Sequence, residues 1–219
     1  MSAQVFHPST NSLARTSLLV GALLAAIIPA LLAVYIRSDF YSRVRDPLSQ
    51  PIPFSHERHV AGNGMDCRYC HTSVENAAFA GIPATETCMT CHSQVLAGTT
   101  LIQNIQTSWD TDKPIVWTRV NDLPDYVFIN HSIHISKGVG CDTCHGPVNQ
   151  MRLTWREHPL QMEWCLDCHR HPEKFLRPRE EVFNMNYQAP ADQLALGERL
   201  VREYNVNTSQ ITSCSTCHR

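Results

Sequence analysis

The chain has 219 residues, a formal net charge of -2 and 43% hydrophobic residues. This length suits one ordinary domain. The near-neutral charge, without a basic stripe, argues against nucleic acid as a partner. Proline, asparagine, threonine and histidine are frequent after the N-terminal apolar segment, so the sequence does not predict a conventional apolar core.

The N-terminal segment predicts a membrane anchor. Residues 1–15 are polar and predict a cytoplasmic N-terminus, and residues 16–37 form an apolar run without charge as far as Ile36. About 20 apolar residues are needed to cross a bilayer as a helix. A cleaved signal peptide is the alternative, but its apolar core is only about 7–15 residues long and ends in a small-residue cleavage site. No good site follows here, so we expect a retained transmembrane helix, followed by a proline-rich linker over residues 38–53.

One motif, Cys-x-x-Cys-His, occurs five times and uses all ten cysteines. It is the attachment signature of a c-type haem, in which two thiols bind the porphyrin and the histidine binds the iron as its proximal ligand. Motifs 1 to 5 place their cysteines at Cys67 and Cys70, Cys88 and Cys91, Cys141 and Cys144, Cys165 and Cys168, and Cys214 and Cys217. Their proximal histidines are His71, His92, His145, His169 and His218. Zinc sites and redox motifs also use Cys-x-x-Cys, but neither requires the histidine that follows it here every time. We predict five covalently bound haem c groups.

Haem attachment also decides the orientation in the membrane. Arg37, Arg43 and Arg45 follow the apolar run and only Arg15 precedes it, so the positive-inside rule alone would put the haem motifs in the cytoplasm. Covalent haem attachment takes place outside the cytoplasmic membrane. We therefore expect a single-pass protein of the bacterial cytoplasmic membrane with its haem domain on the periplasmic side.

The haem motifs belong to an internal repeat. A His-x-x-His pair precedes motif 1, and a second pair precedes motif 3. The two haem-pair units are therefore residues 54–92 and 129–169, with the fifth haem at 214–218. The repeat predicts four distal iron ligands, which are His56, His59, His131 and His134.

The remaining elements complete the expected fold. Residues 114–120 and 126–129 are candidates for short strands, and residues 190–204 predict a helix with proline in its first turn. We expect a multihaem cytochrome c fold: one N-terminal transmembrane helix and a loop-rich, mainly short-helical periplasmic domain, residues 54–219. This domain would be organised around five haems and contain little β structure.

The histidine pairs resemble those of small low-potential multihaem cytochromes, whose haems carry two histidine ligands. There the first histidine of Phe-x-His-x-x-His binds the adjacent haem and the second binds the next haem. The resemblance implies the iron pairs His56–His71, His59–His92, His131–His145 and His134–His169. It also implies that the ligand opposite His218 comes from the interval that contains Met151, His158 and Met162. We expect Met151 or His158, with methionine slightly favoured, and take His171 as a spare surface residue.

Residues 81–89, 116–124 and 160–170 resemble the pentahaem membrane-anchored cytochrome subunit of alternative complex III, a quinol:electron-acceptor oxidoreductase. In that family Met151 and Met162 are typical and His158 is not. The resemblance implies an iron–sulfur/molybdopterin-type subunit, polysulfide-reductase-type membrane subunits and a monohaem cytochrome c as partners, and a soluble electron acceptor.

The expected function is electron transfer through five haems, from a quinol-oxidising membrane complex towards a periplasmic acceptor. Such a subunit would have no catalytic residues or substrate site of its own. The alternative is a small membrane-anchored multihaem quinol dehydrogenase that acts alone. Reduction of a small molecule at an open haem is disfavoured, because the histidine supply allows every iron two protein ligands.

Overall fold

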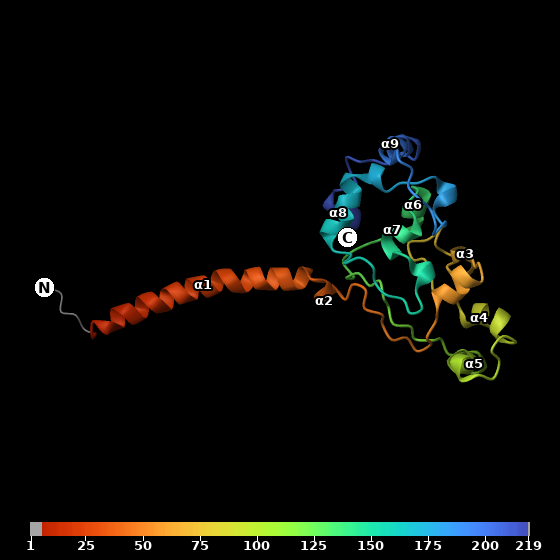
Figure 1. The fold of residues 1–219 in the computed structure, drawn as a ribbon, viewed down its shortest axis with the longest axis horizontal. Helices are drawn as coiled ribbons and strands as arrows, with labels where there is room; N and C mark the ends of the chain where they lie inside the picture. The colour runs from red at the N-terminus through yellow and green to blue at the C-terminus, as the bar shows by residue number, and fades with distance from the viewer. Residues whose placement is uncertain (1–5, 219) are drawn as a thin grey trace. The chain divides into compact units, whose positions relative to one another are not determined.

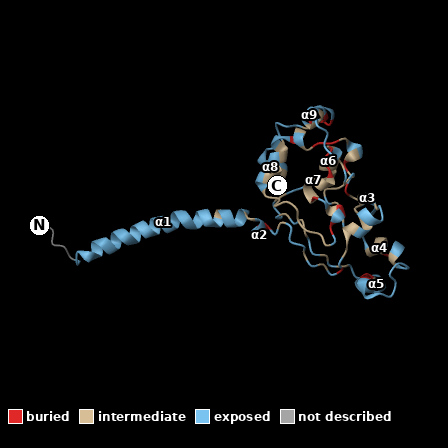
Figure 2. Cartoon of the chain, in the orientation of Figure 1, coloured by how far each residue is buried: buried red, intermediate tan, exposed pale blue. Residues whose placement is uncertain are grey.

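The computed structural model describes residues 6–218 of a chain that divides into two compact units, residues 1–43 and 44–219. The first unit contains α1 (Ser9–Arg37) and the one-turn helix α2 (Asp39–Ser42) (Figure 1). None of the residues of α1 is buried (Figure 2). Among the described residues, α1 is the one helix long and apolar enough to cross a membrane, by its length and composition. It begins earlier than the expected span of residues 16–37 and ends where expected.

Aromatic side chains gather where α1 ends. The ring of Tyr35 lies 5.4 Å from that of Tyr41 and 6.3 Å from that of Phe40, measured between centroids. The chain turns there because the Ser38 hydroxyl accepts a hydrogen bond from the Tyr41 backbone N–H and caps α2. The linker expected over residues 38–53 therefore starts with a helical turn. Tyrosine and other amphipathic rings are enriched at membrane interfaces, so this cluster suits the end of an anchor helix.

The second unit consists of short helices joined by loops (Figure 1). The helices that carry haem motifs are α3 (Cys67–Cys70), α4 (Thr85–His92), α7 (Cys141–His145), α8 (Met162–Arg170) and α10 (Cys214–Cys217). The other α-helices are α5 (Gln103–Thr111), α6 (His131–Ser136) and α9 (Gln193–Glu203). A π-helix, η1 (Glu57–Gly62), and four 3₁₀ turns, η2 (Thr100–Ile102), η3 (Val148–Gln150), η4 (Pro172–Lys174) and η5 (Arg179–Glu181), complete the described part. Helix α9 lies within the span predicted for it.

The two expected strands are absent from the described residues. The chain around residue 118 is extended, but the side chain of Gln50 takes the place of a neighbouring strand: its amide donates to the Thr118 carbonyl and its carbonyl accepts from the Thr118 N–H. In the segment 126–129, Val127 forms a single isolated β-bridge, to His218. β-Propensity alone therefore produced no ladder here, because no second strand lies alongside within the described residues.

Protein side chains form only small apolar clusters in this unit (Figure 2). One cluster contains Ile52, Met89, Ile102 and Ile105, and the Cys88 side chain of motif 2 packs against it. The other contains Val139, Leu176, Leu200 and Tyr204, and the Cys144 side chain of motif 3 packs against it. Each cluster therefore fixes the position of a haem motif. Clusters of this size suit a domain whose interior is completed by a bound cofactor.

Candidate haem-binding sites

Each Cys-x-x-Cys-His motif forms about one helical turn. Residues three apart on a helix lie on the same side, so both sulfur atoms of a motif face one direction. In motif 1 the turn is capped by Asp66, whose carboxylate accepts the Arg68 backbone N–H at 2.8 Å. None of the ten cysteines forms a disulfide. Within residues 6–218 no three His, Cys, Asp or Glu side chains converge as a zinc site requires.

The structure places predicted distal and proximal histidines opposite each other. The ring centroids are 6.3 Å apart for His131 and His145, and the two rings are nearly parallel, with an interplanar angle of 8°. The corresponding distances are 6.2 Å for His134–His169 and 6.1 Å for His59–His92. His56 lies near His71, His59 and His145, whose charges all lower its pKa. Ring contacts therefore bring together three of the four pairs that the resemblance implied.

The spacing of these rings fits an iron atom between them. A histidine nitrogen binds a transition metal at about 2 Å, so two imidazoles on opposite sides of one ion have ring centres about 6 Å apart. The measured 6.1–6.3 Å agree with this value. The residues therefore fit haem iron with two axial histidines, flanked by the two cysteines of each motif.

Every one of the nine histidines in the predicted pairs and motif 5 has a hydrogen bond at Nδ1. Seven bond to backbone carbonyls, at distances of 2.7–3.2 Å: His59 to Ser55, His71 to Gly81, His92 to Val95, His131 to Ala78, His134 to Asn130, His169 to Ile211 and His218 to Tyr126. A ring that donates from Nδ1 keeps the lone pair of Nε2 for a metal. Sequence reasoning missed these partners, because any residue type supplies a backbone carbonyl.

Two histidines bond to side chains instead. The Thr154 hydroxyl lies 3.1 Å from Nδ1 of His56, and the Asn121 amide nitrogen lies 3.0 Å from Nδ1 of His145. The Oδ1 atom of Asn121 is buried without a hydrogen bond. Exchanging the oxygen and nitrogen of this amide gives His145 an acceptor, because Oδ1 then accepts the His145 Nδ1–H. Asn121 thus acts on His145 as the backbone carbonyls act on the other histidines.

Burial keeps several of these imidazoles neutral. It is the main reason that the pKa of His145 falls to about 4, and the nearby His131 and His71 lower it further. Burial likewise lowers the pKa of His56 to about 4, with His71 and His59 adding to the effect, and lowers the pKa of His134. Neutral imidazole is the form that binds a metal.

Burial perturbs the pKa of several motif cysteines. It raises the pKa of Cys144 to about 12 and that of Cys168 to about 11, and the nearby cysteine and aspartate side chains add to the rise. The pKa of Cys67 instead falls to about 7, because the neighbouring Cys141 side chain favours its thiolate.

The two candidates for the fifth distal ligand, Met151 and His158, lie in different surroundings. Met151 is completely buried, and its carbonyl accepts the Glu57 N–H at the start of η1. His158 stacks on Trp164 with centroids 5.0 Å apart. No hydrogen bond or ring contact within residues 6–218 joins either residue to His218. His171 lies 3.4 Å from the carboxylate of Glu173 at the surface, in keeping with its expected role as a spare.

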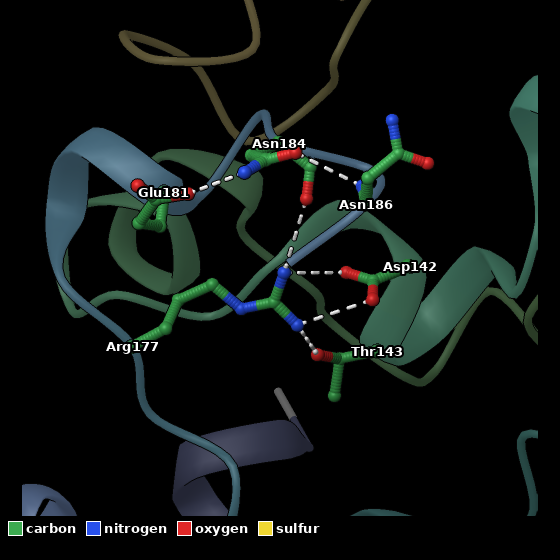
Figure 3. A network of polar contacts seen from close by, with 6 residues as sticks. All are labelled: Asp142, Thr143, Arg177, Glu181, Asn184 and Asn186. Atoms are coloured by element: carbon green, nitrogen blue, oxygen red, sulfur yellow. Dashed lines mark hydrogen bonds and ion pairs between the residues drawn. The ribbon is translucent and has the colours of Figure 1, made fainter. Parts of the chain in front are cut away.

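A buried arginine holds motif 3, which the sequence gave no reason to expect. Arg177 is bonded to the two residues between the motif's cysteines, Asp142 and Thr143 (Figure 3). Its guanidinium also lies 4.5 Å from the ring centroid of Tyr187. The Nε atom of Arg177 is buried without a hydrogen bond among the described residues. This buried ion pair restrains the conformation of motif 3.

Two comparisons match this chain to c-type cytochromes. The family model for cytochrome c7 and related cytochrome c matches residues 52–107 and 127–219. A curated relative, the multiheme cytochrome c subunit of menaquinone reductase from Nitratidesulfovibrio vulgaris (strain Hildenborough), is 38% identical over 97 residues. The match covers 44% of this chain and spans 45% of that protein's length, which is less than half of either.

Proposed function

Because the chain belongs to the family of cytochrome c7 and related c-type cytochromes, we propose that it carries electrons through five covalently bound haems within a larger membrane complex. The observation that carries this proposal is the set of four histidine pairs, three of them with ring centres 6.1–6.3 Å apart. Two axial histidines leave no open position on an iron. Such sites suit electron transfer and not the binding of a substrate.

The residues of the chain divide the work of holding haem. The ten cysteines would attach the porphyrins, and each paired histidine would bind an iron through Nε2, because its Nδ1 is occupied by a hydrogen bond. The bound haems supply reversible one-electron oxidation and reduction. Helix α1 would keep the haem unit at the membrane surface, on the periplasmic side.

The partners follow from the family resemblance and from the relative. We propose a pentahaem subunit of an alternative complex III, which receives electrons from quinol-oxidising partners and passes them to a periplasmic acceptor. The partners would be the iron–sulfur/molybdopterin-type, polysulfide-reductase-type and monohaem cytochrome subunits that the resemblance implies. The relative's name, a menaquinone reductase subunit, supports association with a quinone-linked membrane complex and suggests the opposite electron direction as the competing proposal.

Purification of the protein from its native membranes in a mild detergent tests this function. The expected result is a multi-subunit complex that oxidises quinol and reduces a periplasmic cytochrome, with loss of activity when this subunit is deleted. A complex that uses a periplasmic donor to reduce quinone would reverse the direction. A solitary chain that oxidises a menaquinol analogue as fast as whole membranes would instead support the stand-alone quinol dehydrogenase.

A further inference from the structure

Helix α6 carries two of the predicted distal ligands, and its two ends are held by different parts of the chain. At its start, the carbonyl of Ala78 accepts hydrogen bonds from the backbone N–H and from Nδ1 of His131, at 3.1 and 2.8 Å. The N–H of Ser132 donates to the Ala77 carbonyl at 3.2 Å. The orientation of His131 is therefore fixed by a loop outside the helix.

The ring of His134 is instead oriented by α6 itself. Its Nδ1 donates to the carbonyl of Asn130, four residues earlier, at 2.7 Å. Helix α6 contains only six residues, and an isolated helix of this length is unstable in water. The orientation of His134 therefore depends on the contacts that hold the C-terminal end of α6 in place.

The C-terminal end of α6 is joined to the C-terminal end of α9. The ammonium group of Lys137, directly after α6, donates to the carbonyls of Tyr204 and Asn205, where α9 ends. A cation at a helix C-terminus satisfies carbonyls that have no partner within the helix, and it interacts favourably with the helix dipole. In addition, Nε of Arg179 donates to the Ser136 carbonyl at 2.7 Å.

The ring of Tyr204 connects these contacts. Tyr204 is 5% exposed, and its ring centroid lies 4.2 Å from the guanidinium carbon of Arg179. Its hydroxyl accepts the backbone N–H of Arg179 at 3.2 Å. The ring also belongs to the apolar cluster that contains Val139 and Leu200. Tyr204 thus joins α9, the segment around Arg179 and the turn that follows α6.

The turn after α6 leaves room for this ring. Gly138 has a φ of +81°, a left-handed conformation that residues with a side chain rarely adopt. A Cβ atom there would collide with the Tyr204 ring and with the Arg177 carbonyl. The Gly138 carbonyl accepts the Arg177 N–H at 2.9 Å. Because the turn is packed on both sides, the position of Tyr204 determines where α6 ends.

From these contacts we propose that Tyr204 is a positioning residue for His134: it holds the end of α6 so that His134 stays on the iron opposite His169. The ring centroids of the two histidines are 6.2 Å apart in this arrangement. Without Tyr204 the end of α6 moves and this iron opens, while the loop after motif 1 keeps His131 in place. This role rests on the proposed function for the identity of the iron ligands.

Carbon monoxide binding to the fully reduced holoprotein tests this role, because carbon monoxide needs an open position on an iron. Tyr204→Ala should bind one carbon monoxide per chain more than the wild type. Tyr204→Phe keeps the ring and its packing, so it should behave as the wild type does. A folded Tyr204→Ala protein with all its haems that binds no additional carbon monoxide would overturn the proposal.

Double variants identify the iron that opens. Tyr204→Ala/His134→Ala should bind no more carbon monoxide than His134→Ala alone, since both changes open the same iron. Tyr204→Ala/His131→Ala should bind two per chain, since the two changes open different irons. Two carbon monoxide molecules on the Tyr204→Ala/His134→Ala protein would show that Tyr204 acts on another iron, and the proposal would be wrong.

Lys137→Met provides a second test if Tyr204→Ala does not assemble. It removes the ammonium group and keeps the apolar stem of this partly buried side chain. Histidine must leave the iron before carbon monoxide binds, so the binding rate reports how often it leaves. We expect a rate about tenfold faster than in the wild type, as is typical for loss of a hydrogen bond from a charged group. The exposed Lys113 provides the matched control, Lys113→Met, which should not change the rate. An unchanged rate in Lys137→Met would overturn the proposal.

The single variant His134→Ala separates this proposal from the proposed function. If it opens no iron, the assignment of His134 as a ligand fails, and the role of Tyr204 fails with it. If His134→Ala opens an iron but Tyr204→Ala and Lys137→Met do not, the ligand assignment stands and the role of Tyr204 alone is wrong.

Discussion

The guanidinium of Arg177 lies 2.9 Å from the carboxylate of Asp142, between the two cysteines of motif 3. The residue is almost completely buried, with 6% of its surface exposed, and Gly140 makes room for it. A Cβ atom at Gly140 would collide with the guanidinium, so a larger residue there would displace the Arg177 side chain. Two opposite charges are thus fixed beside one haem site in a place that solvent screens poorly.

Changing either charge should shift the reduction potential of the haem that motif 3 binds. Asp142→Asn leaves a positive charge that favours the reduced iron and raises the potential. Arg177→Leu leaves a negative charge and lowers it. We expect about a tenfold change in the reduction equilibrium, which corresponds to about 59 mV for one electron. A redox titration followed in the visible spectrum measures both shifts.

The double variant Asp142→Asn/Arg177→Leu should return the potential towards the wild-type value, because no net charge is introduced. The exposed Arg202 on α9 provides the control, and Arg202→Leu should leave all potentials unchanged. Equal shifts of the same sign in the two single variants would show that disrupted packing, and not charge, controls the potential.

Removing a distal histidine should open one iron. His131→Ala should retain all five haems, because the cysteines and His145 are unchanged, but should produce a high-spin signal and carbon monoxide binding at one haem per chain. Haem content by the pyridine assay and carbon monoxide titration measure the two effects. His171→Ala is the matched control and should bind no carbon monoxide. A low-spin, carbon monoxide-inert His131→Ala protein would reject the His131–His145 pair.

The side chain of Asn121 should influence, through His145, the reduction potential of the haem that motif 3 binds. Asn121→Leu removes the acceptor at Nδ1, which makes the imidazole a weaker ligand and raises the potential of that haem. Loss of such a partner typically weakens a metal site by about 10- to 100-fold. Asn121→Asp should lower the potential, since a carboxylate is a stronger acceptor. The reduction potentials measured for the two variants must shift in opposite directions if Asn121 orients the ligand.

The ligand opposite His218 can be identified without damaging the core. Met151 is fully buried, and truncation to alanine would cost about 2–5 kcal/mol of stability. The volume-conserving Met151→Leu should fold, and we expect it to expose one high-spin iron while His158→Ala changes little. Met151→His should lower one potential. A high-spin signal confined to His158→Ala would assign histidine to this iron.

The mass of the mature protein tests the anchor and the haem count together. We expect the polypeptide of 24.7 kDa plus five haems, with the segment of α1 retained. Intact-mass spectrometry of protein extracted from membranes measures both. A chain that begins after Ala33 would show that the segment is a cleaved signal, and a smaller haem increment would show an unused motif.

Local patterns were the part of the fold that sequence could predict. The motif helices, α9 and the end of α1 depend on residues close together in the chain. The candidate strand near Trp117 failed because strand formation needs a neighbour, and the Gln50 side chain occupies that position. The pair of Arg177 with Asp142 joins residues 35 positions apart, and no sequence spacing predicts it.

The group that accepts the hydrogen bond at Nδ1 of each histidine determines whether a point mutation can alter that hydrogen bond. A carbonyl such as that of Gly81 or Ile211 survives replacement of its side chain, so seven histidines are insulated from most substitutions. Thr154 and Asn121 are different, because their own side chains supply the partner atom. A single substitution at either residue can therefore remove or strengthen the hydrogen bond. They act on His56 and His145. Natural variants of this cytochrome should therefore differ most in the energetics of the haem sites that contain these two histidines, while the other histidine ligands keep their orientation.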